Sequence, residues 1–170
     1  MRRITTRGDG PTLLASDAVE SLFIAELMSP SPDVWLLSPW VSDIPVIDNR
    51  AGSFAGLAQG MGGHTILLTR ALIELATLGT HVHVVVRPDP RNTKVTDKLR
   101  AATDTTRRIN IVVRDNLHEK ALLTSRFHLH GSMNFTHYGR TVNEESLVLE
   151  NDVSNISRAN LDYHERFGTR

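Results

Sequence analysis

Residues 116–134 read Asn-Leu-His-Glu-Lys-Ala-Leu-Leu-Thr-Ser-Arg-Phe-His-Leu-His-Gly-Ser-Met-Asn, and this stretch decides the fold. Its two runs 119–124 and 126–130 predict the two strands of a hairpin. His118 and Lys120 stand two residues apart, so on a strand their side chains share one face. The run Gly131-Ser132-Met133-Asn134 then leaves the second strand as a tight loop of small polar residues.

Five polar side chains of this region suit one kind of chemistry. They are His118, Lys120, Ser132, Asn134 and Glu145. A neutral imidazole is a competent nucleophile toward phosphorus when a carboxylate orients its other nitrogen. A lysine can neutralise the non-bridging oxygens of a phosphodiester, and hydroxyl and amide groups can add hydrogen bonds as charge shifts. The five side chains together can therefore bind and attack a phosphodiester without a metal.

The pattern resembles the phospholipase D superfamily, whose motif is His-x-Lys-x4-Asp, then Gly-Ser-x-Asn, then a downstream Glu. The motifs cover residues 116–150, and the rest of the chain resembles the family by layout. The resemblance implies that His118, Lys120 and Glu145 are catalytic and that Lys120, Ser132 and Asn134 bind phosphate. It implies no metal and no cofactor.

Two positions of the motif need comment. Ser125 stands five residues after Lys120, where the family usually has a supporting Asp. Glu144 rivals Glu145 for the glutamate role, and Glu145 is preferred because eleven residues after Asn134 is the spacing associated with bacterial nucleases of the family.

The chain holds a single copy of the motif. His81-Val82-His83 is not followed by Gly-Ser-x-Asn, and His128-Leu129-His130 leads into the same Gly131–Asn134 run that completes the first motif, not into a second one. Covalent attack needs a second group to protonate the leaving oxygen, and in this superfamily a second histidine supplies it. One copy per chain therefore implies a homodimer with both motifs facing across a two-fold axis.

Length and composition predict a single domain over residues 1–170, with 40% hydrophobic residues and no cysteine. The first ten residues lack the apolar stretch of a signal peptide, and no run approaches 18 apolar residues, so we expect a cytoplasmic protein. The net charge is zero, which argues against a uniformly basic nucleic-acid-binding surface. Nine Lys/Arg and five Asp/Glu between residues 87 and 120 form either a cationic stripe leading to the site or a solvated helix face.

The hydrophobic pattern predicts an α/β fold, with a mixed, mostly parallel sheet and helices on both faces. Residues 1–10 are expected to be a flexible arm, and the glycine-rich residues 41–64 a loop. Ile156, Leu161 and Phe167 are expected to be core contacts of the last helix. The remaining predicted elements are helices over 17–28, 65–78, 93–102 and 155–166, and strands over 34–40, 81–86, 109–113 and 146–149.

Other histidines and tryptophans have competing interpretations. A pair of histidines at i and i+2, as in 81/83 and 128/130, can bind a metal. Without a convergent carboxylate or cysteine, we favour cross-strand packing or a pocket wall. Trp35 is expected in the core. Trp40, at the end of its strand, either lines a pocket or stacks on a base.

The favoured function is a metal-independent nuclease acting on DNA through a phosphohistidine at a homodimer interface. The stretch from Ser38 to Arg50 (Ser-Pro-Trp-Val-Ser-Asp … Ile-Asp-Asn-Arg) also resembles phospholipase-D-like proteins encoded with bacterial DNA 7-deazaguanine modification systems. This implies a role in DNA modification, restriction or phage defence, with other proteins of such a system as partners. The alternatives are a catalytically silent dimer that binds DNA or a partner protein, and, more weakly, a lipid phosphodiesterase.

Overall fold

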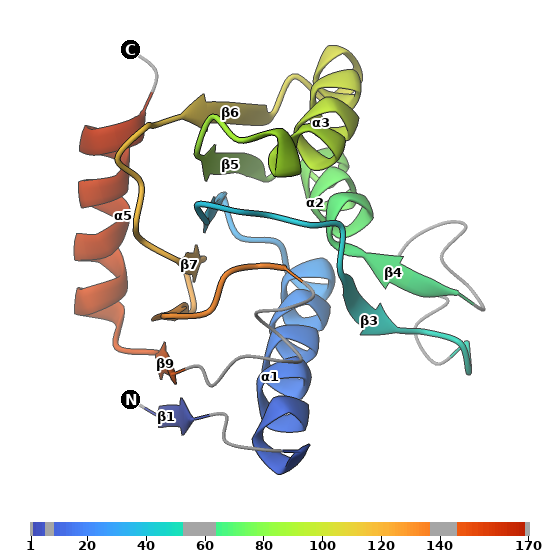
Figure 1. The fold of residues 1–170 in the computed structure, drawn as a ribbon, viewed down its shortest axis with the longest axis vertical. Helices are drawn as coiled ribbons and strands as arrows, with labels where there is room; N and C mark the ends of the chain where they lie inside the picture. The colour runs from blue at the N-terminus through green and yellow to red at the C-terminus, as the bar shows by residue number, and fades with distance from the viewer. Residues whose placement is uncertain (1, 6–8, 53–63, 137–145, 169–170) are drawn as a thin grey trace.

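A seven-stranded sheet forms the centre of the molecule (Figure 1). The computed structural model describes residues 2–5, 9–52, 64–136 and 146–168. The strand order is β1-β9-β8-β7-β2-β5-β6. The strands are β1 (Arg2–Thr5), β2 (Asp33–Leu37), β5 (His81–Val86), β6 (Ile109–Val113), β7 (Ala121–Leu123), β8 (His128–Gly131) and β9 (Ser146–Glu150).

The sheet is mixed, as predicted, but it is not mostly parallel. Only the pairs β2–β5 and β5–β6 are parallel among the described strands. The pairs β2–β7, β7–β8, β8–β9 and β1–β9 are antiparallel. The strand–helix–strand pattern correctly predicted parallel neighbours in the first half. The hairpin of the second half brings its own antiparallel neighbours, and these form the larger part of the sheet.

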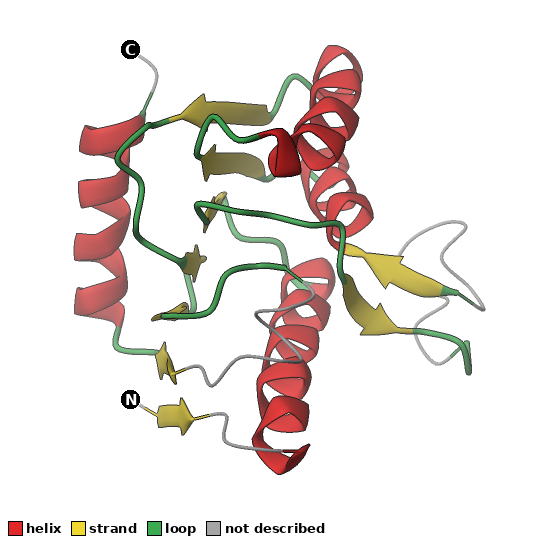
Figure 2. Cartoon of the chain, viewed as in Figure 1, coloured by secondary structure: helices red, strands yellow, loops and turns green. Residues whose placement is uncertain are grey.

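Helices cover both faces of the sheet, as predicted (Figures 1 and 2). On one face lie α1 (Asp9–Met28), α2 (Leu68–Thr77) and α3 (Thr93–Thr106), the last preceded by a 3-10 turn, η1 (Pro90–Asn92). Among the described helices, α5 (Val153–Phe167) covers the opposite face. No described helix has both the length and the apolar character to cross a bilayer.

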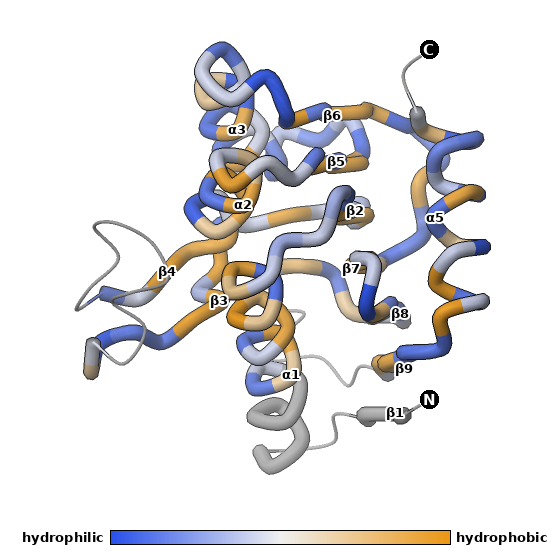
Figure 3. The backbone as a smooth tube through the Cα atoms, turned by 180° about the vertical axis from the view of Figure 1, so that it is seen from behind, coloured by the Kyte–Doolittle hydropathy of each residue, from blue (hydrophilic) through white to orange (hydrophobic). Residues whose placement is uncertain are grey.

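Each face has its own hydrophobic core, because residues of a strand alternate between the two sides. Leu36 packs with the larger cluster under α1, α2 and α3, whereas Trp35 and Leu37 pack with Tyr163 and Phe167 of α5. In Figure 3, orange hydrophobic segments lie along β5 and β6, between α2 and α3 on one side and α5 on the other. Trp35 is fully buried, which confirms its predicted core position.

Several predicted bounds were wrong. The expected arm over 1–10 contains β1, which pairs with β9, and α1 begins at Asp9 rather than at residue 17. The expected loop over 41–64 contains β3 (Pro45–Asp48), which pairs with β4 (Thr65–Leu67) in a separate two-stranded sheet. The helix predicted from residue 65 therefore begins at Leu68. Leu161 is 65% exposed, while Ile156 and Phe167 are buried as expected.

Candidate active site

Four connecting segments meet at one end of the large sheet, where the strands β2 and β5 terminate. β2 and β5 are parallel, so the segments after them, 38–44 and 87–92, leave at the same edge, where sites of open α/β sheets lie. The segment after β8 reaches them, because the Ser42 N–H donates to the Phe135 carbonyl at 2.8 Å. The segment before β7 also begins here, since the Arg114 N–H donates to the Val86 carbonyl at 2.9 Å.

His118 and Lys120 lie in the segment that leads into β7. The predicted strand began at residue 119, but β7 itself begins at Ala121. Pairing with β8 continues to Lys120, whose carbonyl accepts the Gly131 N–H at 3.2 Å. Glu119, between the two motif residues, accepts hydrogen bonds from Tyr163 Oη at 2.5 Å and Arg166 Nη2 at 2.9 Å, so α5 holds this segment.

Arg87 contacts the proposed nucleophile. Its Nη2 lies 2.9 Å from His118 Nε2. The same Nη2 lies 3.3 Å from His118 Nδ1, and because a guanidinium can only donate hydrogen bonds, the ring nitrogen that accepts here carries no hydrogen and has an available lone pair. That is the state in which an imidazole can attack phosphorus. Nε of Arg87 is buried, and none of the described residues provides it with an acceptor.

Asn92 fixes the backbone around Arg87. Its side-chain amide donates to the carbonyls of Arg87 at 2.9 Å and Pro39 at 3.0 Å, and its Oδ1 accepts the Val41 N–H at 2.8 Å. One buried side chain thus ties together the segments that follow β2 and β5. Sequence reasoning missed both Arg87 and Asn92 as site residues. The available signal was their place directly after the buried strand 81–86.

The Gly-Ser-x-Asn loop leaves β8 as predicted and is bonded to the start of β9. The Ser132 N–H donates to the Ser146 carbonyl, and the Ser146 N–H donates to Ser132 Oγ, both at 3.0 Å. Gly131 has φ +155°, and a Cβ there would lie 1.9 Å from the Ser146 carbonyl oxygen. Only glycine allows the two backbones to approach this closely. Asn134 Oδ1 is buried and lacks a partner among the described residues.

Glu145 and its rival Glu144 lie outside the described residues, so their predicted role stays a prediction. The described chain resumes at Ser146, which is bonded to Ser132. Of the five predicted site residues, four are described. His118 and Lys120 lie before β7, and Ser132 and Asn134 lie after β8, at the same end of the hairpin.

Ser125 lies at the opposite end of that hairpin, in the turn between β7 and β8. Its Oγ is 2.7 Å from Ser31 Oγ, and its N–H donates to the same oxygen at 3.1 Å. Five residues of extended chain separate it from Lys120, or roughly 16 Å. The residue at the position of the motif Asp therefore supports the turn and is remote from Lys120 and the other described motif residues.

We expect Ser125→Ala to leave the rate of phosphodiester cleavage within about twofold of wild type, because removing a remote hydroxyl leaves transition-state contacts intact. The rate is measured on labelled DNA beside a thermal unfolding scan. A tenfold loss of rate without loss of folding would place Ser125 in the catalytic machinery.

Trp40 takes part in a cluster at the rim of this edge. Its Nε1 donates to Asp89 Oδ2 at 3.1 Å, and the Arg91 guanidinium lies 4.4 Å from the ring centroid. Arg91 also donates to both Asp89 carboxylate oxygens, at 2.9 and 2.7 Å, and lowers the pKa of that carboxyl. Arg91 thus covers one face of the indole. The base-stacking role of Trp40 stays a prediction.

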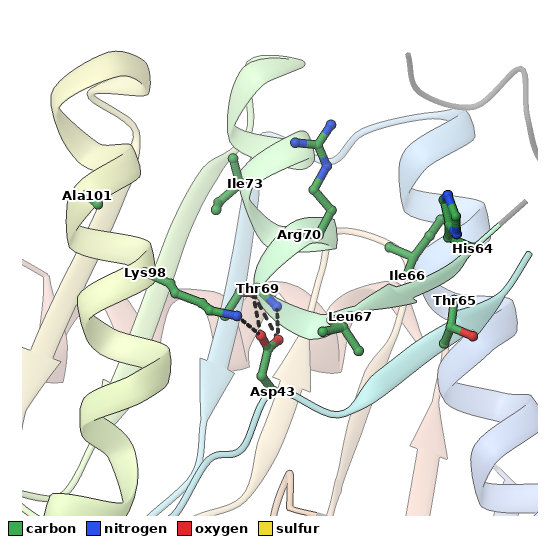
Figure 4. Close-up of a pocket in the computed structure, with 10 residues that line it drawn as sticks. All are labelled: Asp43, His64, Thr65, Ile66, Leu67, Thr69, Arg70, Ile73, Lys98 and Ala101. Atoms are coloured by element: carbon green, nitrogen blue, oxygen red, sulfur yellow. Dashed lines mark hydrogen bonds and ion pairs between the residues drawn. The ribbon is translucent and has the colours of Figure 1, made fainter. Parts of the chain in front are cut away.

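A cavity of about 560 Å³ is distinct from the motif. It lies beside β4, α2 and α3, and Figure 4 shows Lys98 and Thr69 converging on Asp43. Burial raises the pKa of Asp43, but the hydrogen bonds from Lys98 and Thr69 outweigh it and lower the pKa. Lys98 Nζ lies 2.6 Å from Asp43 Oδ2, so the two side chains form an ion pair. His118 lines a smaller cavity of about 340 Å³, together with Arg114, Asp115, Asn116, Leu117, Arg166 and Phe167.

Both histidine pairs have a carboxylate beside them, contrary to the sequence interpretation. His83 lies 3.0 Å from Asp33 Oδ1 and stacks on Trp35 with ring centroids 3.9 Å apart. His128 and His130 converge with Glu150. Burial, with a smaller contribution from His130, lowers the pKa of His128 to about 4, so its imidazole is neutral at pH 7. The register that brings Glu150 opposite His128 could not be read from the sequence.

Comparison with known proteins supports the fold. No family model matches the sequence, and no curated protein sequence matches it. Among solved structures, NucT from Helicobacter pylori matches with a TM-score of 0.63 and 14% identity, over 96% of this chain and 92% of NucT. Nuc from Salmonella typhimurium, a phospholipase D family member, matches with a TM-score of 0.58 and 15% identity, over 86% of this chain and 84% of Nuc.

A third match is TrmBL2, an archaeal chromatin protein that binds DNA, with a TM-score of 0.54 and 12% identity. It covers 98% of this chain and 52% of TrmBL2. Identities this low show the fold alone. The fold is phospholipase-D-like, as the motif predicted.

Proposed function

We propose that this protein is a metal-independent phosphodiesterase that cleaves DNA through a phosphohistidine intermediate at a homodimer interface. The observation that carries the proposal is the contact of His118 Nε2 with Arg87 Nη2 at 2.9 Å. It couples an imidazole lone pair to a cation suited to phosphate, at the sheet edge that also holds Lys120, Ser132 and Asn134.

In the first step, His118 Nε2 attacks phosphorus, a P–N bond forms and the P–O bond to the leaving oxygen breaks. The partner subunit's His118 donates a proton to that oxygen. In the second step the same histidine takes a proton from water, whose oxygen attacks phosphorus while the P–N bond breaks. Glu145 is proposed to orient the His118 imidazole, and no metal takes part.

Lys120, Ser132 and Asn134 are proposed to hold the phosphate during both steps. Arg87 joins them by moving its guanidinium from the imidazole to a non-bridging oxygen, where bidentate donation suits phosphate. Asn92 keeps Arg87 within reach through its hydrogen bond to the Arg87 carbonyl.

DNA is the proposed substrate for two reasons. Arg87, Arg91, Arg114 and Lys120 lie in the segments that meet at this sheet edge, and a phosphate backbone favours such local positive charge even on a protein of zero net charge. The fold also resembles that of TrmBL2, which binds DNA. The likeness of Ser38–Arg50 to proteins of DNA modification systems further suggests a cytoplasmic role in DNA modification or phage defence, with partner proteins of that system.

The test is cleavage of labelled single- and double-stranded DNA in EDTA, combined with the molar mass from light scattering. We expect chelator-resistant cleavage by a species of twice the chain mass. Acid-labile, alkali-stable phosphate on the protein after rapid quenching would identify the phosphohistidine. Cleavage that appears only after Mg²⁺ is added would contradict the mechanism, and an active monomer would contradict the shared site.

A second candidate function is a catalytically silent dimer that binds DNA or a partner protein. The likeness to a DNA-binding chromatin protein favours it. Tight, salt-dependent DNA binding with no cleavage of any tested DNA would support this function over the first.

A further inference from the structure

A histidine–histidine–glutamate group lies on the α5 side of the sheet. His128 and His130 are two residues apart on β8, so their side chains share one face. Glu150 on β9 is the antiparallel Cα partner of His128. The strand register alone therefore brings two imidazoles and a carboxylate to one patch of the sheet.

The three side chains converge closely enough to share an ion. One ligand atom from each lies within 4.8 Å of the others, and the two imidazole centroids are 4.5 Å apart. Tetrahedral zinc with bonds near 2.05 Å needs ligand atoms about 3.4 Å apart. Small rotations of half-buried side chains supply that difference. Two nitrogen donors and one carboxylate favour zinc over magnesium or calcium.

Neighbouring side chains already orient the group. Asn155 Nδ2 donates to Glu150 Oε1 at 2.6 Å. Tyr163 Oη donates its hydrogen to Glu119, so it can only accept from His128 Nε2, which lies 3.2 Å away. That network places the His128 proton on Nε2 and leaves a lone pair on Nδ1. Hydrogen bonds of this kind to the outer side of metal ligands fix their tautomer and direction.

We propose that His128, His130 and Glu150 bind one zinc ion, with the fourth position open to water. The ion would join β8 to β9. Gly131 and Ser132 follow His130 directly, so zinc would also hold the base of the Gly-Ser-x-Asn loop. The ion has no place in the phosphodiester chemistry proposed above, and its binding is measured without substrate.

A second group, Asp33, His83 and His164, is a weaker candidate. His83 Nε2 is already paired with Asp33 at 3.0 Å, and its ring is stacked on Trp35. His164 Nε2 is 3.8 Å from the same carboxylate oxygen. Binding a metal there would break the existing His83–Asp33 pair.

The test is zinc titration of the full chain without a histidine tag, stripped of metal, in competition with a chromogenic chelator. We expect one zinc per chain, and at least about a tenfold loss of affinity in His128→Gln and in Glu150→Gln. His81→Gln, which alters an exposed histidine bonded to Arg108, should keep wild-type affinity. X-ray absorption of the zinc-loaded protein should show two imidazole ligands.

Glu150→Gln keeps an oxygen that can accept from Asn155, so this variant should fold even if His128→Gln does not. Thermal unfolding of each metal-free variant checks this. Absence of zinc binding to the wild type would overturn the proposal. Unchanged affinity in a folded Glu150→Gln protein would also overturn it, and loss of binding in His83→Gln would then assign the ion to the second group.

Discussion

Replacing His118 by alanine is expected to lower the rate of chelator-resistant DNA cleavage by at least about a thousandfold. The variant loses the nucleophile of one protomer and the acid of the other, so both chemical steps fail at every site of the dimer. Lys120, Ser132, Asn134 and Arg87 remain and can still hold the phosphate, so DNA affinity should change far less than the rate. The measurement is the initial rate at saturating DNA, with affinity measured separately.

His81→Ala is the matched control for this substitution. His81 is exposed, and its Nε2 lies 2.8 Å from the Arg108 guanidinium, so it also has an arginine neighbour. It stands at the start of β5, whereas Arg87 follows the end of that strand. We expect wild-type cleavage from this control. A His118→Ala protein that keeps a tenth of the wild-type rate would show that another group attacks the phosphate.

The strands that the sequence predicted well are those with the least ambiguous pattern. His81–Val86 and Ile109–Val113 are short apolar runs rich in β-branched residues, and both have the predicted bounds. β3 was missed because it lies in a polar, glycine-rich context, where burial is decided by contacts with α1 and β4. β1 was missed because it is formed by pairing with β9, more than 140 residues later in the chain.

In the candidate site, too, the sequence predicted what depends on neighbouring residues and missed what depends on contacts between distant segments. Residues of the motif are close in sequence, so their spacing predicted that His118, Lys120, Ser132 and Asn134 gather at one end of a hairpin. Arg87 comes from another strand, 31 residues before His118. No local sequence pattern predicts that Arg87 contacts His118. The significance of Ser125 was also beyond the sequence, because only the fold shows that it lies at the far end of the hairpin, in contact with Ser31, which follows α1.

An ion pair between the buried Glu26 carboxylate and the partly exposed Arg126 guanidinium lies beside Ser125 and supports the hairpin turn. Glu26 of α1 is 2% exposed and accepts from Arg126 Nη2 at 2.7 Å, from the Ser31 N–H at 2.9 Å and from Ser31 Oγ at 3.1 Å. Arg126 also donates to the Ser29 side chain and carbonyl. The network ties the turn between β7 and β8 to the end of α1, and thereby fixes the end of the hairpin opposite His118.

Arg126→Met is expected to lower the free energy of unfolding by about 2 to 3 kcal/mol at pH 7, because it leaves the Glu26 carboxylate buried without its cation. The upper part of the usual range is not expected, since the Arg126 side chain is 38% exposed and water screens the pair. The measurement is the urea midpoint and slope of the metal-free protein, which also test for a two-state transition.

Arg100→Met provides the control for losing an arginine. Arg100 pairs with Asp97 at 3.0 Å on the surface of α3, with side chains 55% and 62% exposed, so this change should cost less than about 0.5 kcal/mol. Adding Glu26→Gln to Arg126→Met should restore part of the lost stability, because it removes the uncompensated charge. If Arg126→Met costs no more than Arg100→Met, or if the double variant is less stable than Arg126→Met alone, the Glu26 carboxylate does not depend on Arg126, and Ser31 is sufficient to stabilise it.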